Sequence, residues 1–309
     1  MSEESPPPQR AEIPATIPQE QIVVAQVVEP PPARPARRRD MPNWLLPLAL
    51  FLMTCRSTWE IMGPKYAAAL MTILVCHEAG HFFQARRYGV PTSFPFFIPL
   101  PYRLIPNFFG TMGAVIAMDP RIPNRKALFD IGATGPLFGL LPTLICCYVG
   151  LSTDAQWMDR AQVRPGIEFG DPLLLQWMAG SILGPMPENS ILIIGPVAMA
   201  GYVGLLVTSL NLIPIGQLDG GHVLYAILGR RAHPIARLLL VGCAIGAIVY
   251  EFYWWILMLV LLTLFGPAHP PTHCDTEPLG LWRSIVGWAL LAFVVIGFAP
   301  NLIVEMPGK

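Results

Sequence analysis

Charged residues are scarce in this sequence. Only 13% of its 309 residues are Asp, Glu, Lys or Arg, whereas about 25% is usual for a soluble domain. Hydrophobic residues make up 53%, and the mean hydropathy is +0.51. The 20 basic and 20 acidic residues balance, so no net charge favours binding to nucleic acid. This composition excludes an ordinary soluble domain and predicts a polytopic membrane protein.

Closely spaced cysteine pairs are also missing. The six cysteines form no C-x-x-C pair, and most of them fall within apolar stretches: Cys55, Cys76, Cys146, Cys147, Cys243 and Cys274. Neither a disulfide framework nor a cysteine zinc site is therefore indicated. We expect these residues to be small core side chains.

Residues 1–42 differ in composition from the rest of the chain. Prolines occupy positions 6–8 and 30–32, aromatic residues are lacking, and Arg37–Arg39 follow. Such a segment buries too little apolar surface to offset the entropy lost on ordering, so we expect a disordered cytoplasmic tail. A docking site for a proline-binding partner is the alternative. The segment has no apolar central region and too many acidic residues for a signal or transit peptide, which favours a prokaryotic plasma membrane over a plastid envelope.

Long apolar stretches follow one another from residue 43 onward. A helix needs roughly 20 apolar residues to cross a bilayer, and about six or seven candidate spans lie at 43–62, 65–88, 126–151, 191–218, 233–250, 252–267 and 284–304. Glu251 interrupts the run from 235 to 266, which we interpret as a short hairpin instead of one long tilted helix. The sequence thus predicts an all-α membrane domain at 43–304, followed by a short tail at 305–309.

Basic residues mark one side of the predicted membrane. They precede the first span, end the second, precede the third and follow the fourth: Arg37–Arg39, Arg86, Arg87, Arg121, Arg125, Lys126, Arg230, Arg231 and Arg237. Basic loops usually face the cytoplasm. The N-terminus is therefore predicted to be cytoplasmic, and the more acidic loop 152–190 is predicted to face outward.

Two histidines interrupt the second span, in the motif His77-Glu78-Ala79-Gly80-His81. Residues four positions apart share a helix face, so both imidazoles can bind one tetrahedral zinc ion. Glu78 lies about 100° around the helix and can take the proton of a water molecule that zinc has acidified. Two satisfied core histidines are the weaker alternative, because ionisable groups are costly in hydrocarbon. The motif predicts metal-assisted hydrolysis with Zn²⁺ as the cofactor.

A second polar cluster, Leu218-Asp219-Gly220-Gly221-His222, ends the fourth predicted span. Its distance from the basic residue Arg230 puts it toward the same membrane face as the first motif, so the two clusters can meet. We predict that the Asp219 carboxylate is the third metal ligand. His222 is the competing candidate, and otherwise lies beside the ligands or at a helix end.

The stretch between the second and third spans cannot be a regular helix, because it contains five prolines: Pro91, Pro95, Pro99, Pro101 and Pro106. Residues 108–118, with Gly110 and Gly113, suit a short re-entrant β-hairpin at membrane depth. The free edge of this hairpin would pair with an unwound substrate segment. A loop on the membrane surface is the alternative. We expect Gly113 to help position the substrate.

Asn211 and Pro214 precede the second cluster and are predicted to position the substrate as well. Asn211 can hydrogen-bond a substrate backbone, and Pro214 can kink the helix at the depth of the site. An Asn211 side chain that bonds only a neighbouring helix is the alternative. His269 and His273 are expected to be solvated in a cytoplasmic loop, with a regulatory metal contact as the alternative.

Two pairs of glycines have the spacing of close helix contacts in lipid. Gly135-x-x-x-Gly139 lies in the third span and Gly242-x-x-x-Gly246 lies in the fifth. Small residues let helix backbones approach one another. We therefore interpret both pairs as packing features and not as functional sites.

The two polar motifs together resemble those of the site-2 protease family of intramembrane zinc metalloproteases. The resemblance covers roughly residues 65–231, and Phe94–Met118 is similar to the re-entrant hairpin of that family. It implies a three-span catalytic core in which His77, His81 and Asp219 hold zinc and Glu78 is catalytic. The loop 152–190 departs from many members, because it is too short for a PDZ domain; folded domains rarely have fewer than about 50 residues.

These features predict a zinc-dependent endopeptidase that cuts membrane-spanning proteins near the cytoplasmic face, in regulated intramembrane proteolysis. Its partners would be the protein substrate and the lipid bilayer. A metal-binding transporter would also carry intramembrane His and Asp, but the clusters show no inverted repeat. A catalytically silent scaffold would not need Glu78.

Overall fold

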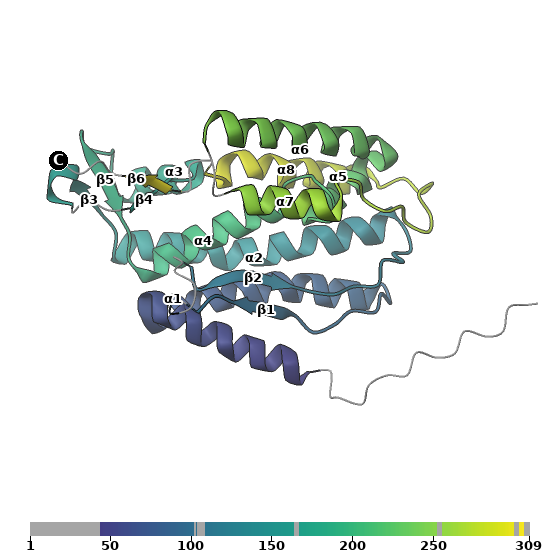
Figure 1. Ribbon diagram of the computed structural model, residues 1–309, viewed down its shortest axis with the longest axis horizontal. Coiled ribbons are helices and arrows are strands. Elements are labelled where there is room, and N and C mark those ends of the chain that lie inside the picture. Colours follow the sequence, from purple (N-terminus) through teal and green to yellow (C-terminus); the bar gives the residue numbers. More distant parts are fainter. Residues whose placement is uncertain are drawn as a thin grey trace, which may run out of the picture. The chain divides into compact units, whose positions relative to one another are not determined.

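The computed structural model describes residues 44–101, 103, 109–163, 167–251, 255–299 and 303–305. Most of this part of the chain is helical, and three two-stranded sheets complete it (Figure 1). The proline-rich tail 1–42 and residues 306–309 lie outside the described residues, so the expectations for them stay predictions.

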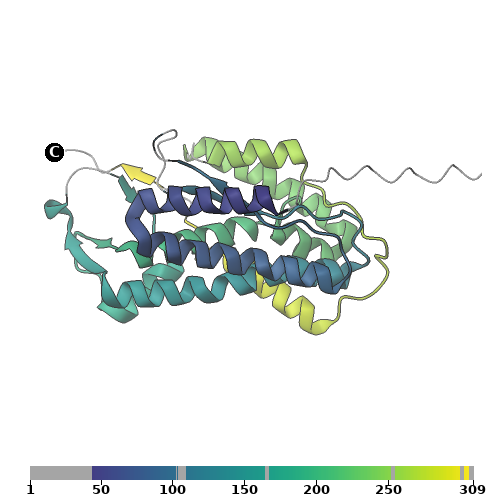
Figure 2. The same ribbon diagram turned by 90° about the horizontal axis from the view of Figure 1, so that it is seen from below.

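Helix α1 (Leu45–Arg87) consists of two arms that meet at Met62 and Gly63. Gly63 has φ 79°, a left-handed conformation that glycine adopts without strain, and Pro64 follows it. The chain reverses direction at this kink, and Figure 1 shows the two arms diverging from it. Figure 2 gives the view from below. The arms correspond to the two predicted spans 43–62 and 65–88.

A β-hairpin follows α1. Strands β1 (Phe96–Pro99) and β2 (Thr111–Val115) pair in antiparallel register, with Phe97 opposite Ala114. The predicted hairpin is therefore present, with its first strand in the proline-rich stretch. Residues 102 and 104–108, between the strands, lie outside the described part of the chain.

Helices α2 (Arg125–Thr153) and α4 (Pro196–Asn211) pack closely. The Asn124 side chain accepts a hydrogen bond from the Ala127 amide and so caps the start of α2. Small residues line the contact: a Cβ added to Gly150 would lie 2.2 Å from the Ala198 nitrogen. The predicted third span, 126–151, agrees with α2.

The fourth predicted span, 191–218, is wrong at both ends. Residues Ser190–Ile193 form strand β5, and α4 ends at Asn211. The chain then turns, and α5 (Asp219–Leu228) begins at the acidic residue that we expected at the end of a helix. Pro214 lies in this turn, where the missing proline N–H costs no helical hydrogen bond.

The remaining helices are α6 (Ala232–Val249), α7 (Ile256–Phe265) and α8 (Leu281–Gly297). Helices α6 and α7 are separate and contact each other, in agreement with the hairpin interpretation of 235–266. The close contact predicted for Gly242 and Gly246 is wrong among the described residues, because a Cβ on either would meet nothing within 4 Å.

The predicted outward loop 152–190 is more structured than expected. It contains β3 (Gln156–Asp159), β4 (Ile167–Phe169) and the apolar helix α3 (Leu173–Leu183). Strand β3 pairs with β5, and β4 pairs with β6 (Ile303–Glu305), which lies where we expected the last span to end. The all-α prediction thus misses two small sheets.

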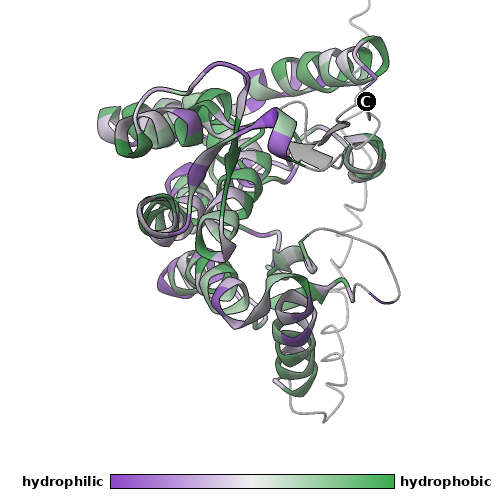
Figure 3. Ribbon diagram, turned by 90° about the vertical axis from the view of Figure 1, so that its left-hand side faces the viewer, coloured by the Kyte–Doolittle hydropathy of each residue, from purple (hydrophilic) through white to green (hydrophobic). Residues whose placement is uncertain are grey.

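Among the described residues, three helical stretches are long and apolar enough to cross a membrane: Leu45–Arg87, Arg125–Thr153 and Asp219–Val249. Helices α3, α4 and α8 are apolar but shorter, and α7 has only 10 residues. The predicted count of six or seven spans is not confirmed. Large apolar side chains on these helices are exposed, Leu238, Ile248 and Leu264 among them, as expected for surfaces that face lipid. The ribbon coloured by hydropathy in Figure 3 shows that hydrophobic residues predominate along the helices.

Gly150→Ala is expected to destabilise the protein, because the added methyl group must push α4 away from α2. Overpacking of this kind costs about 1–3 kcal/mol. Gly180→Ala in α3 is the matched control, since a Cβ there meets nothing within 4 Å. Thermal unfolding of both variants in detergent checks the expectation. Equal melting temperatures would contradict the close α2–α4 contact.

Candidate metal centre

The two histidines of the first motif lie on one face of the second arm of α1. Their Nε2 atoms are 3.2 Å apart, and both side chains are buried. One turn of helix separates His77 from His81, so the imidazoles project together as the spacing predicts.

Asp219 is brought to this pair by the turn between α4 and α5. Its Oδ2 atom lies 3.2 Å from Nε2 of His77 and 3.3 Å from Nε2 of His81. Gly220 allows the close turn, because a Cβ there would lie 1.9 Å from the Leu212 carbonyl oxygen. The two motifs therefore meet, as their positions along the spans predicted.

These three atoms fit a tetrahedral metal ion. Ligands bonded to zinc at about 2.0–2.1 Å in tetrahedral geometry are about 3.3 Å from one another, which matches the observed separations of 3.2–3.3 Å. Oδ2 of Asp219 is moreover buried without a hydrogen-bond partner among the described residues. A buried carboxylate oxygen in this position is costly unless a cation compensates it. Two imidazoles and one carboxylate are ligands that zinc prefers.

A backbone carbonyl of α2 fixes the orientation of His81. Nδ1 of His81 lies 2.8 Å from the Ile131 oxygen. A carbonyl can only accept, so Nδ1 carries the proton and the lone pair of Nε2 is left for a metal. Support of this kind is typical of metal-binding histidines.

Glu78 and the metal-binding side chains line one cavity of about 160 Å³. Strand β2 supplies Ala114 and Val115 to its wall, and the turn before α5 supplies Gln217. Glu78 is buried at this cavity. Asn211 also lines it, with Nδ2 3.2 Å from Nε2 of His77, so the structure places this predicted positioning residue beside the metal cluster.

Two other predicted positioning residues lie elsewhere. Pro214 lines a separate apolar cavity between α6, α7 and α8. Pro214 lies after the end of α4 and is not among the residues that line the metal cavity, and its substrate-positioning role stays a prediction. Gly113 lies in β2 with φ 96° but is not among the residues that line the metal cavity.

The histidines outside the first motif also differ from expectation. His222 lines the metal cavity but is not part of the three-residue metal cluster, in agreement with our preference for Asp219. His273 is exposed as predicted. The solvated position predicted for His269 is wrong, because its side chain is 6% exposed and pairs with His222.

Glycines of α2 support the site in a way that the sequence did not reveal. A Cβ on Gly135 would lie 1.9 Å from Nε2 of His81, and a Cβ on Gly139 would lie 3.0 Å from Nδ1 of His77. The spacing of these glycines correctly predicted a close helix contact. It could not show that these glycines contact His77 and His81, the two imidazoles of the candidate metal site.

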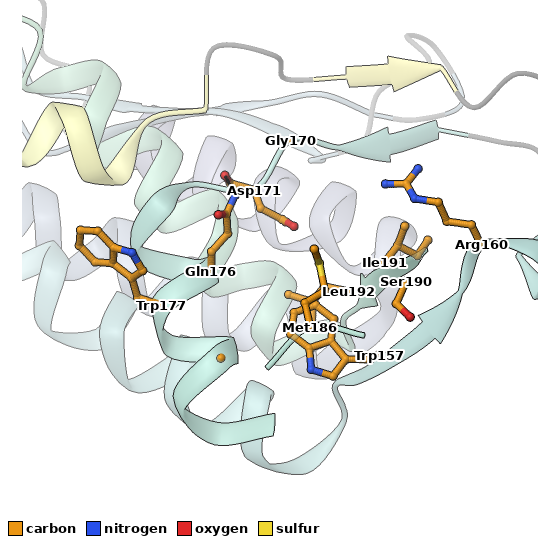
Figure 4. Close-up of a pocket in the computed structure, with 11 residues that line it drawn as sticks. Trp157, Arg160, Gly170, Asp171, Gln176, Trp177, Met186, Ser190, Ile191 and Leu192 are labelled. Atoms are coloured by element: carbon orange, nitrogen blue, oxygen red, sulfur yellow. Dashed lines mark hydrogen bonds between the residues drawn. The ribbon is translucent and has the colours of Figure 1, made fainter. Parts of the chain in front are cut away.

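A larger cavity, of about 560 Å³, lies between β3, β5 and α3 (Figure 4). Trp157, Arg160, Asp171, Trp177 and Met186 are among its lining residues. It contains none of the predicted site residues. Among the described residues, the one group of three or more metal-binding side chains lies in the smaller cavity, which therefore holds the groups suited to hydrolysis.

Comparison with known proteins agrees with this chemistry. The model of peptidase family M50 matches residues 65–249, a range that includes all the residues of the metal cluster. The chain therefore belongs to peptidase family M50, and the resemblance to site-2 proteases is confirmed. No solved structure matches the chain.

Similar proteins of known name come from plants. "Probable zinc metalloprotease EGY2, chloroplastic" of Oryza sativa subsp. indica is 29% identical over 81% of this chain and 45% of its own length. "Probable zinc metalloprotease EGY1, chloroplastic" is 31% identical in Oryza sativa subsp. japonica, over 76% of this chain and 40% of its own, and 30% identical in Arabidopsis thaliana, over 76% and 44%. The chain thus spans less than half the length of these relatives.

Gly135→Ala is expected to weaken zinc binding by about 10-fold or more, because the added methyl group overlaps the metal-binding nitrogen of His81. Gly242→Ala is the matched control, since a Cβ there has open space. Zinc content after dialysis against a graded chelator measures the effect. Wild-type zinc retention in Gly135→Ala would contradict the contact between α2 and the metal cluster.

Proposed function

We propose that this chain is a zinc-dependent intramembrane endopeptidase, in which His77, His81 and Asp219 hold the metal and Glu78 is the catalytic base. The observation that carries the proposal is the convergence of three buried ligand atoms, 3.2–3.3 Å apart, in a cavity that Glu78 also lines. Membership of peptidase family M50 supports the same reaction.

The cavity residues can perform the proton transfers of peptide hydrolysis. A bound zinc ion would acidify a water molecule and polarise the scissile carbonyl. Glu78 then accepts a proton from the attacking water and later donates it to the leaving amine nitrogen. Burial of Glu78 keeps bulk water from competing for this carboxylate. The Asn211 amide lies beside His77 and would donate a hydrogen bond to a substrate carbonyl.

The β1–β2 hairpin supports an extended substrate. A membrane-spanning helix hides its carbonyls in its own hydrogen bonds, so it must unwind before a protease can cut it. Ala114 and Val115 of β2, with Ile116 and Met118 just after it, line the metal cavity. An unwound substrate segment that pairs with the edge of β2 is held next to the metal cluster and has its backbone groups satisfied. Gly113 would help to position the substrate indirectly, because its left-handed backbone conformation shapes β2.

The substrates that fit this arrangement are membrane-spanning proteins cut near the cytoplasmic face, as in regulated intramembrane proteolysis. The cytoplasmic N-terminus, the outward position of 152–190 and a total of six or seven passes stay predictions from the sequence. The prokaryotic plasma membrane likewise stays a prediction, since the names of the plant relatives place those proteins in chloroplasts. Comparing the membrane proteomes of cells that carry active or Glu78→Gln protein identifies the substrate as the single-span protein that accumulates.

Glu78→Gln is expected to abolish cleavage and to retain zinc, because glutamine keeps the size of the side chain and loses its basicity. The loss should exceed 100-fold, given that general-base catalysis contributes about 10²–10⁴-fold. His77→Ala and Asp219→Ala should lose zinc as well as activity. Cleavage of the tagged accumulating protein in liposomes and zinc content per chain are the two measurements. Full activity in Glu78→Gln would refute the proposed base.

Ala114→Pro is expected to reduce cleavage at least about 10-fold with zinc retained, because proline removes a backbone N–H from β2 and prevents regular strand pairing. Ala114→Val is the matched control, since valine has a similar volume and keeps the N–H. The same liposome assay compares the two variants. Equal cleavage by both would rule out pairing of the substrate with β2 at this residue.

A further inference from the structure

A second pair of histidines lies next to the metal cluster. Nδ1 of His222 and Nε2 of His269 are 2.7 Å apart, and the rings meet edge to face. His222 belongs to the first turn of α5 and lines the metal cavity. His269 comes from the loop 266–280 between α7 and α8 and is buried. Neither residue has a role in the mechanism described above.

The loop 266–280 is fixed in place by contacts with three other parts of the chain. The Gly216 amide, in the turn that carries Asp219 to the site, donates to the Pro267 oxygen at 3.0 Å. Nε2 of His233 lies 3.0 Å from the His269 oxygen. The Tyr225 hydroxyl of α5 donates to Oδ2 of Asp275 at 2.7 Å. His269 is therefore held firmly against α5.

Hydrogen bonds determine which nitrogens of the pair carry protons. Nδ1 of His269 bonds the Pro270 carbonyl oxygen, which can only accept, so this Nδ1 is protonated. Nε2 of a neutral His269 then has a lone pair and accepts from Nδ1 of His222. A neutral His222 with its proton on Nδ1 has a lone pair on Nε2. The chain of bonds thus makes Nε2 of His222 a hydrogen-bond acceptor.

Burial keeps His269 neutral. Desolvation in its buried position lowers the pKa of His269 to about 4; the hydrogen bond to the Pro270 carbonyl and the charge of Asp275 act in the opposite direction, and the nearby His233 acts with desolvation. A protonated Nε2 of His269 would instead donate to Nδ1 of His222 and leave the His222 proton on Nε2, so the assigned tautomer requires a neutral His269. The tautomer assignment therefore holds at neutral pH.

A substrate strand needs acceptors on both of its edges. Strand β2 can satisfy the N–H groups on one edge only, because neighbouring residues of a strand direct their N–H groups alternately to opposite sides. The N–H groups on the other edge are buried in the cavity and must be accepted by other lining groups. Nδ1 of His222 is taken by His269, so Nε2 is the ring nitrogen left to face a ligand.

We propose that His222 is a substrate-binding residue whose Nε2 accepts a hydrogen bond from a backbone N–H of the extended substrate, and that His269 is a positioning residue which fixes His222 in the required tautomer. This inference rests on the proposed peptidase function. The proposed hydrogen bond between Nε2 of His222 and a substrate N–H lies on the α5 side of the cavity. It involves only the substrate backbone, so it does not depend on the substrate's side chains.

The first test compares His269→Leu with His269→Gln. Leucine removes the acceptor for Nδ1 of His222, whereas glutamine places an amide oxygen near the position of the lost Nε2. We expect kcat/KM to fall about 10-fold or more in His269→Leu and to recover largely in His269→Gln. His273→Leu, in the same loop but exposed, is the control and should match the wild type. The substrate is the tagged single-span protein that accumulates with Glu78→Gln.

The second test separates a substrate contact from simple anchoring of the loop. In His222→Asn the side-chain amide can still donate to His269, but nothing replaces Nε2. We expect this variant to keep its melting temperature and zinc content and to lose about 10-fold or more in kcat/KM. Long-range ¹H–¹⁵N spectra of histidine-labelled protein give a readout without substrate: His222 should be protonated on Nδ1 in the wild type, with mixed tautomers in His269→Leu.

Several results would overturn the proposal. Wild-type cleavage by His222→Asn would show that the pair only anchors the loop. An Nε2-protonated His222 in the wild type, or His269→Gln as slow as His269→Leu, would remove the assigned tautomer role. If His269→Leu fails to fold, cleavage by His222→Asn and the tautomer of His222 in the wild-type spectrum still test the proposal. Failure of the peptidase function itself is distinct, because wild-type protein and Glu78→Gln would then be equally inactive.

Discussion

Burial of the Asp219 carboxylate between two imidazoles is the constraint on which the rest of the structure depends. A carboxylate oxygen without a hydrogen-bond partner is expensive inside an apolar bundle, and the Ile131 carbonyl keeps the proton of His81 on Nδ1, away from this oxygen. A divalent cation removes this cost by binding all three groups at once. The surrounding helices must then hold two distant parts of the chain at ligand distance, which accounts for the close α1–α2 and α2–α4 contacts and for the turn before α5.

The meeting of His77, His81 and Asp219 could be predicted from the sequence because the spacing of the two motifs has few explanations. Histidines four apart in an apolar helix share a face, and the acidic cluster near the same membrane side is their obvious partner. The hairpin was predictable for a related reason, since prolines exclude a helix and few other structures remain at that depth. These signals are local and depend on helix geometry alone.

The path of the chain between these motifs could not be predicted from the sequence. The hydropathy of residues 191–218 predicts one span, yet α4 ends at Asn211. The chain can turn there because Gly220 has no Cβ and can pack against the Leu212 carbonyl. Because of that turn, Asp219 begins a helix, although the sequence predicted it at the end of one. His269 was misjudged likewise, since its burial depends on a loop packing against α5. Contacts between distant segments decide both cases.

Helix α2 contributes no metal ligand, yet the Ile131 carbonyl orients His81, and Gly135 leaves the space that this ring occupies. The affinity of the site for its metal is thus a property of the gap between two helices as well as of three side chains. Anything that tilts α2 against α1, including the thickness of the surrounding bilayer or its replacement by a micelle, changes that gap. Metal affinities measured in different lipids or detergents therefore describe different helix spacings and are not interchangeable.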